Sequence, residues 1–123
     1  MQRLVGIVRL EQEMQEALGV LETLKKRTAA VAVHGHREYN PSWHTALDLG
    51  HLLTVSEAIT RCAIERKESR GGHFREDFPD KAAEFGTINI AVRQAADGSM
   101  ELRRVPIPEM PTELKQVIQD ESR

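Results

Sequence analysis

Cysteine and aromatic residues are scarce in this chain of 123 residues. Cys62 is the only cysteine, which excludes an internal disulfide and fits a reducing compartment, so a cytoplasmic location is expected. Aromatic residues make up only 4% of the chain, and the core must therefore come mainly from Leu, Ile, Val and Ala side chains. This composition favours helices packed on helices.

Neither charge is in large excess, since the formal net charge is -2 at pH 7. The chain has no surplus of Lys and Arg with which to neutralise a phosphate backbone, which argues against a nucleic-acid partner. Long hydrophobic runs are missing as well. The apolar residues 4–8 are bounded by Arg3 and Arg9 and lack a small-residue cleavage site, so we predict neither a signal peptide nor a membrane span.

Motifs that hold cofactors or metals are also missing. No Gly-x-Gly-x-x-Gly follows a predicted strand, so the chain has no dinucleotide fingerprint. There is no Cys-x-x-Cys or His-Glu-x-x-His, and His44 and His51 lie two helical turns apart, too far to share a metal ion without extra chain. We therefore predict no catalytic, cofactor-binding or metal-binding residue. The histidines that could offer nitrogen ligands are His34, His36, His44, His51 and His73.

Two stretches of the sequence have apolar residues at helical spacing. The first predicts an amphipathic helix over residues 3–30, with basic residues in its last turns, where they complement the helix dipole. The apolar pattern is already present at Leu4 with no capping residue before it, so we expect this helix to begin at the start of the chain. We interpret this abrupt start as the truncation of a longer parent protein. Its apolar residues are Ile7, Leu10, Met14, Leu18, Leu21 and Leu24.

The second helix is predicted over residues 41–68, because Asn40 is a favoured N-cap and Pro41 suits the first helical position. Trp43 is expected to anchor the core, and Cys62 is interpreted as a buried structural thiol because no paired histidine is evident. The two helices should form an antiparallel pair. The apolar positions of the second are Ala46, Leu49, Leu52, Leu53, Ile59 and Ala63.

Beyond residue 80 the periodicity changes. Apolar residues alternate over residues 88–93 and again over 100–103, and Asp97-Gly98 between them is typical of a hairpin turn. A proline-rich connector then leads to a short helix capped by Thr112. The predicted fold is mainly α, namely a long antiparallel helix pair or small up-down bundle of the spectrin-repeat kind, followed by a β-hairpin and a C-terminal helix. Residues 1–79 form its helical core, and residues 80–123 form the hairpin and tail of the same domain.

The segment between helix and hairpin, residues 63–79, reads AIERKESRGGHFREDFP. It resembles a signature of the succinate dehydrogenase, fumarate reductase and L-aspartate oxidase flavoproteins, in which a helix runs into Glu-Ser-Arg-Gly-x-His and continues to Arg-x-Asp near a proline. The segment LVGIVR at residues 4–9 is similar to the Gly-Ile-Val-Arg segment of the same family. The resemblance therefore covers at least residues 4–79. Residues 75–77 are more similar to the dehydrogenase and reductase branch than to the aspartate oxidases.

The resemblance implies the C-terminal helical domain of a flavoprotein subunit that interconverts succinate and fumarate. In that family FAD lies in a separate upstream domain, as do the substrate-binding His and Arg residues and the proton-donating Arg. The chain is therefore expected to be structural, with no cofactor of its own and no catalysis in isolation. Its expected partners are the flavin domain of the parent chain and the iron-sulfur subunit of the complex, which would place it in the cytoplasm or at the cytoplasmic face of the membrane.

Two arginines near a glycine pair form the candidate docking surface, because guanidinium groups can bind carboxylates of a neighbouring domain. The alternative is a loop held by ion pairs within its own domain. A second alternative for the whole chain is a free-standing helical module that binds another protein. Self-association is also expected in isolation, because a helix pair with a hairpin leaves one apolar side thinly covered. The candidate interdomain docking residues are Glu68, Arg70, Gly71, His73, Arg75 and Asp77.

The missing flavin fingerprint leads to a first prediction. The purified chain should be colourless and should show no succinate-dependent dye reduction, because nothing in its sequence would hold an adenine dinucleotide pyrophosphate. The check is a visible absorption spectrum together with a dye-reduction assay. A yellow, flavin-bearing chain would contradict the prediction.

Overall fold

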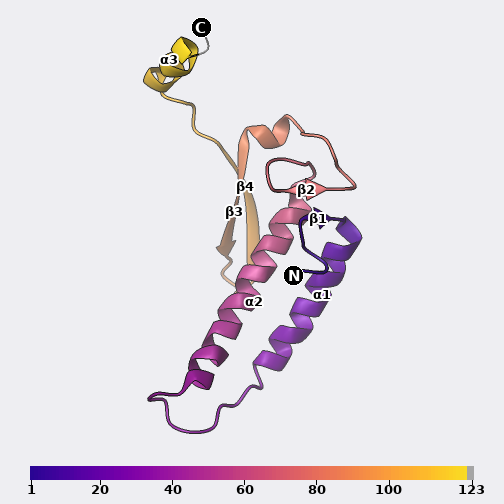
Figure 1. The fold of residues 1–123 in the computed structure, drawn as a ribbon, viewed down its shortest axis with the longest axis vertical. Coiled ribbons are helices and arrows are strands. Elements are labelled where there is room, and N and C mark those ends of the chain that lie inside the picture. The colour runs from indigo at the N-terminus through magenta and orange to yellow at the C-terminus, as the bar shows by residue number, and fades with distance from the viewer. Residues whose placement is uncertain (122–123) are drawn as a thin grey trace.

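The two long helices lie side by side and antiparallel in the computed structural model, which describes residues 1–121 (Figure 1). They are α1, Glu11–Thr28, and α2, Pro41–Glu65. A hairpin of β3, Ile88–Gln94, and β4, Met100–Pro106, follows α2 and lies beside it. The last helix, α3, Thr112–Glu121, stands away from the body beyond an extended connector. The mainly helical fold predicted from the sequence is thus confirmed.

The start of α1 differs from the prediction, which was wrong for residues 3–10. These residues form turns, bends and the short strand β1, Val8–Arg9, which pairs in parallel with β2, Phe74–Arg75. Leu4 and Val5 are nevertheless buried in the core, so apolar spacing alone could not distinguish this turn from helix. The long-range ladder to β2 sets the conformation here. Close packing also contributes, because a Cβ on Gly6 would lie 2.9 Å from the carbonyl oxygen of Gln2.

The beginning of α2 is as predicted. The side-chain oxygen of Asn40 accepts hydrogen bonds from the backbone N–H groups of Ser42 and Trp43, at 3.1 and 3.4 Å, and Pro41 occupies the first turn. The helix ends at Glu65, three residues earlier than predicted, because Arg66 takes an extended conformation with φ -83° and ψ 93°. The chain then turns, which brings the Glu68 carboxylate back to the Arg66 side chain.

The core is concentrated at the end of the helix pair where β1 and β2 lie. Its buried members are Leu4, Val5, Met14, Ala17 and Ala63, with Ile64 packed against them. The expectation for Trp43 was wrong. Trp43 lies in the first turn of α2, and its side chain is only half-buried, with the Arg37 guanidinium over its ring and the His44 ring nearly perpendicular to it. Cys62 is also half-buried rather than buried, although its partial burial raises the pKa of the thiol.

The predicted hairpin is confirmed. Strands β3 and β4 pair in antiparallel register from Ile88 opposite Pro106 to Gln94 opposite Met100. Gly98 at the turn has φ +84°, a conformation that favours glycine. The contacts between the hairpin and α2 include an ion pair between Arg104 and Glu65 at 2.7 Å. The division at residue 79 into helical core and tail stays a prediction, and the last two residues of the proposed tail lie outside the described residues.

Candidate functional site

The loop after α2 contains all six candidate docking residues, and we call it the Glu68–Asp77 loop. Two of its residues are completely inside the protein, because neither Glu68 nor Arg75 has exposed surface. A charged group loses its hydration when it is buried, so each must be compensated by hydrogen bonds and opposite charge. The loop is therefore built around two buried charges, whose partners decide what it can do.

The buried guanidinium of Arg75 uses every N–H that it has. Its Nε and Nη2 atoms donate to the two carboxylate oxygens of Asp77, both at 2.6 Å, which is the bidentate geometry of strong pairs. Nη2 also donates to Glu11 in the first turn of α1, at 3.1 Å. Nη1 donates to the backbone carbonyls of Ala63 and Ile64 in α2, at 2.9 and 3.2 Å. One side chain thus joins both helices to the loop.

The β1–β2 ladder explains why Arg75 points inward. Successive residues of a strand point to opposite sides, so Arg75 enters the protein while Phe74, 40% exposed, faces solvent. The backbone N–H of Arg75 donates to the Ser69 hydroxyl at 2.8 Å, which fixes the strand across the loop. Asp77 also accepts from the backbone N–H of Glu11, at 3.2 Å. The carboxylate thereby caps α1, whose own N-cap residue offers no side-chain hydrogen bond.

The second buried charge, Glu68, accepts hydrogen bonds at both oxygens. Arg70 donates to them from Nε and Nη2 at 2.8 and 3.0 Å, Arg66 donates at 2.6 Å, and the backbone N–H of Ala82 donates at 2.9 Å. The Arg70 hydrogen bonds, ahead of the others, lower the pKa of the Glu68 carboxyl to about 2. Arg70 also packs over Gly86, where a Cβ would lie 3.2 Å from Nη2. Glu68 thus ties the loop to the segment before the hairpin.

His73 links the ladder to the end of α2, and its partners define its tautomer. Nη1 of Arg9 lies 2.7 Å from Nδ1 and can only donate, so Nδ1 must be unprotonated. Nε2 therefore carries the proton and donates to the backbone carbonyl of Arg66 at 3.0 Å. Burial lowers the pKa of His73, and the nearby charges of Arg9, Arg75 and Arg66 lower it further, against the opposing effect of the carbonyl. The imidazole is held neutral.

The structure shows the local ion pairs that were the alternative to docking. Both Arg70 and Arg75 pair with acids of their own chain, while a docking role for the six residues stays a prediction. Gly71 has φ +59° and open space around it, so it is needed for backbone conformation and not for close packing. Sequence reasoning missed Glu11 and Arg66 as partners. The helix was predicted to begin at residue 3, whereas in the structure Glu11 is its first residue.

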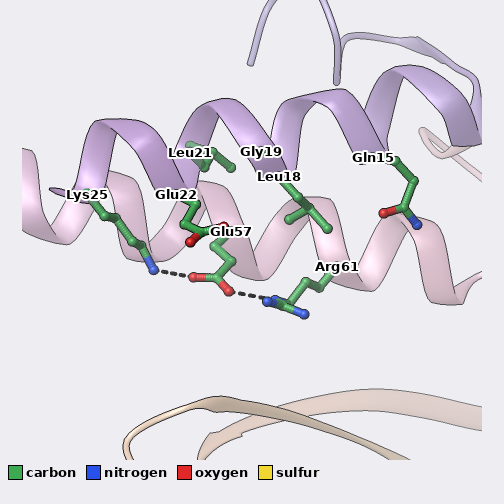
Figure 2. A pocket seen from close by; sticks show the side chains of 8 residues that line it. All are labelled: Gln15, Leu18, Gly19, Leu21, Glu22, Lys25, Glu57 and Arg61. Carbon is green, nitrogen blue, oxygen red and sulfur yellow. Dashed lines mark hydrogen bonds and ion pairs between the residues drawn. The ribbon is translucent and has the colours of Figure 1, made fainter. Parts of the chain in front are cut away.

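A second candidate lies along the helix pair, in a groove of about 490 Å³. Figure 2 shows Lys25 of α1 and Arg61 of α2 both bonded to the Glu57 carboxylate between them. Partial burial is the largest single influence on the pKa of Glu57 and raises it. The hydrogen bonds and charges of Lys25 and Arg61 together outweigh burial, so the pKa is lowered. The three charges satisfy one another. The ion pairs therefore link the two helices, and none of these three charged groups is free to react.

Two further properties of residues 1–121 bear on the earlier predictions. Nowhere in this part of the chain do three or more histidine, cysteine, aspartate or glutamate side chains come together as metal ligands would. Also within this range, no helix is both long and apolar enough to cross a bilayer.

Comparison with known proteins decides the family. The model of the fumarate reductase flavoprotein C-terminal family matches residues 1–119. The chain belongs to this family. Among its relatives, the fumarate reductase flavoprotein subunit of Mycobacterium tuberculosis H37Rv is 30% identical over 103 residues, which is 83% of this chain. The L-aspartate oxidase of Acinetobacter baylyi is 41% identical over 62% of the chain. Membership in the family predicted from the loop motif is confirmed.

Solved structures of the family have the same fold. A chain of Mycobacterium smegmatis Sdh1 in complex with UQ1 superposes with a TM-score of 0.79 and 38% identity over 98% of this chain. E. coli quinol fumarate reductase superposes with a TM-score of 0.71 and 28% identity over 90% of it. The chain spans only about a fifth of these proteins, 21% and 20% of the solved chains and 18% of the Mycobacterium tuberculosis relative. It is thus the flavoprotein C-terminal domain of the succinate dehydrogenase and fumarate reductase family.

The position of Arg75 generates a stability prediction for the 123-residue chain. Replacing Arg75 by Gln should lower the free energy of unfolding by about 3–5 kcal/mol, because it removes one partner of a buried ion pair. The lower end is expected, since Glu11 and Asp77 remain 41% and 26% exposed and can be hydrated. Urea unfolding followed by circular dichroism measures the loss. Arg93→Gln, which removes an exposed pair with Glu101, is the matched control and should leave the midpoint unchanged.

The neutral state of His73 generates a prediction about pH. Its pKa is lower in the folded chain than in the unfolded one, so the unfolded chain binds more protons and stability must fall as pH falls below about 6.5. Thermal melts from about pH 7.5 to about pH 5.5 should therefore show a smaller loss for His73→Gln than for the unaltered chain. The exposed His51→Gln control should keep the original slope. Equal slopes in all three chains would refute the assignment.

Proposed function

We propose that this chain is the docking part of a flavoprotein subunit that interconverts succinate and fumarate, with FAD and substrate bound by the rest of the subunit. The family relatives are flavoprotein subunits of oxidoreductases, which supports an enzymatic parent. On this proposal the chain itself binds neither FAD nor dicarboxylate and is inactive alone. Its partners are the flavin domain of the parent and the iron-sulfur subunit, at the cytoplasmic face of the membrane.

The observation that carries the proposal is the network of hydrogen bonds that holds the Glu68–Asp77 loop. Its two buried charges have fixed partners in α1, in α2 and in the segment before the hairpin, so its outer surface is held in one arrangement. A preformed surface binds with a smaller loss of conformational entropy than a mobile one. Glu68 and Arg75 would thus position the loop from inside, while the exposed Gly71 and Phe74 and the 38% exposed Arg70 would face the partner.

The competing proposal is a free-standing helical module that binds an unrelated protein. It draws on the exposed apolar side chains of α2, such as Leu52 and Val55, 63% and 56% exposed. Gene context separates the two proposals. A reading frame that continues upstream into a glycine-rich flavin fingerprint supports the flavoprotein subunit, whereas an independent start with no such sequence supports the module.

The prediction for Arg70 tests docking in the intact flavoprotein. Arg70→Ala should lower flavin retention or assembly with the iron-sulfur subunit, because it removes the part of the guanidinium that faces outward. The absorbance ratio of flavin to protein and co-purification of the iron-sulfur subunit measure the two effects. Lys81→Ala, an exposed cation nearby, is the matched control.

The same change in the 123-residue chain separates docking from a local role. Arg66 and the Ala82 N–H still hold Glu68 after Arg70 is removed, so the isolated chain should stay folded. Unfolding of the isolated variant would show that the ion pair with Glu68 is its main role. A variant that assembled, kept its flavin and lost only turnover would place Arg70 in the active site and contradict the proposal.

A further inference from the structure

A pocket of about 520 Å³ lies beside the Glu68–Asp77 loop, between β1, the end of α2 and β3. We call it the Arg9 pocket. Its walls combine two arginines, Arg9 and Arg66, with the apolar side chains of Ile59 and Ile90 and the thiol of Cys62. No carboxylate lines it, in contrast to the groove along the helix pair, which contains Glu57. The pocket therefore has both basic and apolar walls.

The charge of Arg9 has no acidic counterpart among the described residues. Its Nε donates to the carbonyl of Gly6 at 2.9 Å, and its Nη1 donates to the neutral ring of His73 at 2.7 Å, so both fixed partners are uncharged. Glu76 is bonded to Arg9 through the backbone, its N–H donating to the Arg9 carbonyl at 3.0 Å, and no ion pair joins its carboxylate to Arg9 among residues 1–121. Asp77 pairs with Arg75, and Glu68 is shared by two other arginines. A half-buried guanidinium with uncharged partners leaves donors and a full positive charge directed to an incoming group.

The two fixed hydrogen bonds also hold Arg9 in position. A long arginine side chain normally loses much conformational freedom when it binds, and one that is already held by Gly6 and His73 loses less. Positive charge, spare N–H donors and prior order are the features of an anion site. The apolar side of the pocket adds a preference for a group attached to a carbon framework, because free inorganic anions gain nothing from Ile59 and Ile90.

We propose that the Arg9 pocket receives an aspartate or glutamate side chain, next to an apolar residue, from the polypeptide segment that covers this face in the assembled flavoprotein. This inference rests on the proposed docking function and adds to it the chemistry of one contact. The carboxylate pairs with Arg9, and its apolar neighbour packs against Ile59 and Ile90. Cys62 lies in the same pocket and is the only cysteine of the chain, so its reaction with a thiol reagent reports whether the pocket is covered.

The first arm of the test uses the 123-residue chain labelled with ¹⁵N and two blocked tripeptides, Leu-Asp-Leu and Leu-Asn-Leu. The aspartate peptide should shift the Arg9 Nε–H resonance in a saturable way and bind at least about ten-fold more tightly than the asparagine peptide. Arg9→Gln should abolish the preference, whereas Arg27→Gln, a matched change on exposed α1 surface, should keep it. Equal binding of the two peptides to the unaltered chain overturns the proposal, even if the Arg9 variant fails to fold.

The second arm uses the intact flavoprotein and measures alkylation of Cys62 by mass spectrometry. Alkylation should be about ten-fold slower in the intact protein than in the 123-residue chain, and Arg9→Gln should restore much of the faster rate. If Cys62 is protected equally with and without Arg9, docking stands and the carboxylate contact is wrong. If Cys62 reacts as fast in the intact protein as in the isolated chain, this face is uncovered, the carboxylate contact is wrong, and the Arg70 assembly assay alone decides docking.

Discussion

The buried guanidinium of Arg75 is the constraint on which the rest of this structure depends. Each of its five donors is met inside the protein, by partners from α1, α2 and its own loop. The segment carrying it must therefore cross from the end of α2 to the beginning of α1. The β1–β2 ladder meets this requirement by turning Arg75 inward, and Asp77, which pairs with Arg75, also caps α1. The Glu68–Asp77 loop thus holds the two helices together through the Arg75 side chain.

The parts of the fold that could be predicted from the sequence depend on neighbouring residues. Asn40 caps the helix that begins one residue later, and Gly98 makes the turn between adjacent strands, so each signal and its effect are close together. Residues 3–10 were misassigned because their conformation depends on a partner strand far away in the chain. Apolar spacing placed Leu4 in the buried stripe, but it also included Ile7, which is 81% exposed, and it does not distinguish a helix from a turn as the cause of burial.

The candidate site was located from its motif, but its chemistry was not. Sequence reasoning assigned Glu68 and Arg75 to an outer docking surface, and the structure shows both with no exposed area. The sequence does not reveal the burial of these two side chains, because charged residues in a loop usually lie in solvent. Only the structure shows that each buried charge faces an opposite one. The same limit applies to Arg9, since the sequence cannot show that its partners, Gly6 and His73, are uncharged.

The long separation between the partners in the ladder has a consequence for how the protein folds. Arg75 and Glu11 are 64 positions apart, as are His73 and Arg9, whereas α1 and α2 are joined by the short connection of residues 29–40. Closing a long loop costs more entropy than closing a short one, so the helix pair should form first and the ladder last. The outer surface of the Glu68–Asp77 loop then exists only in chains that have finished folding. A partner that recognises this surface would select completed domains and leave half-folded ones unbound.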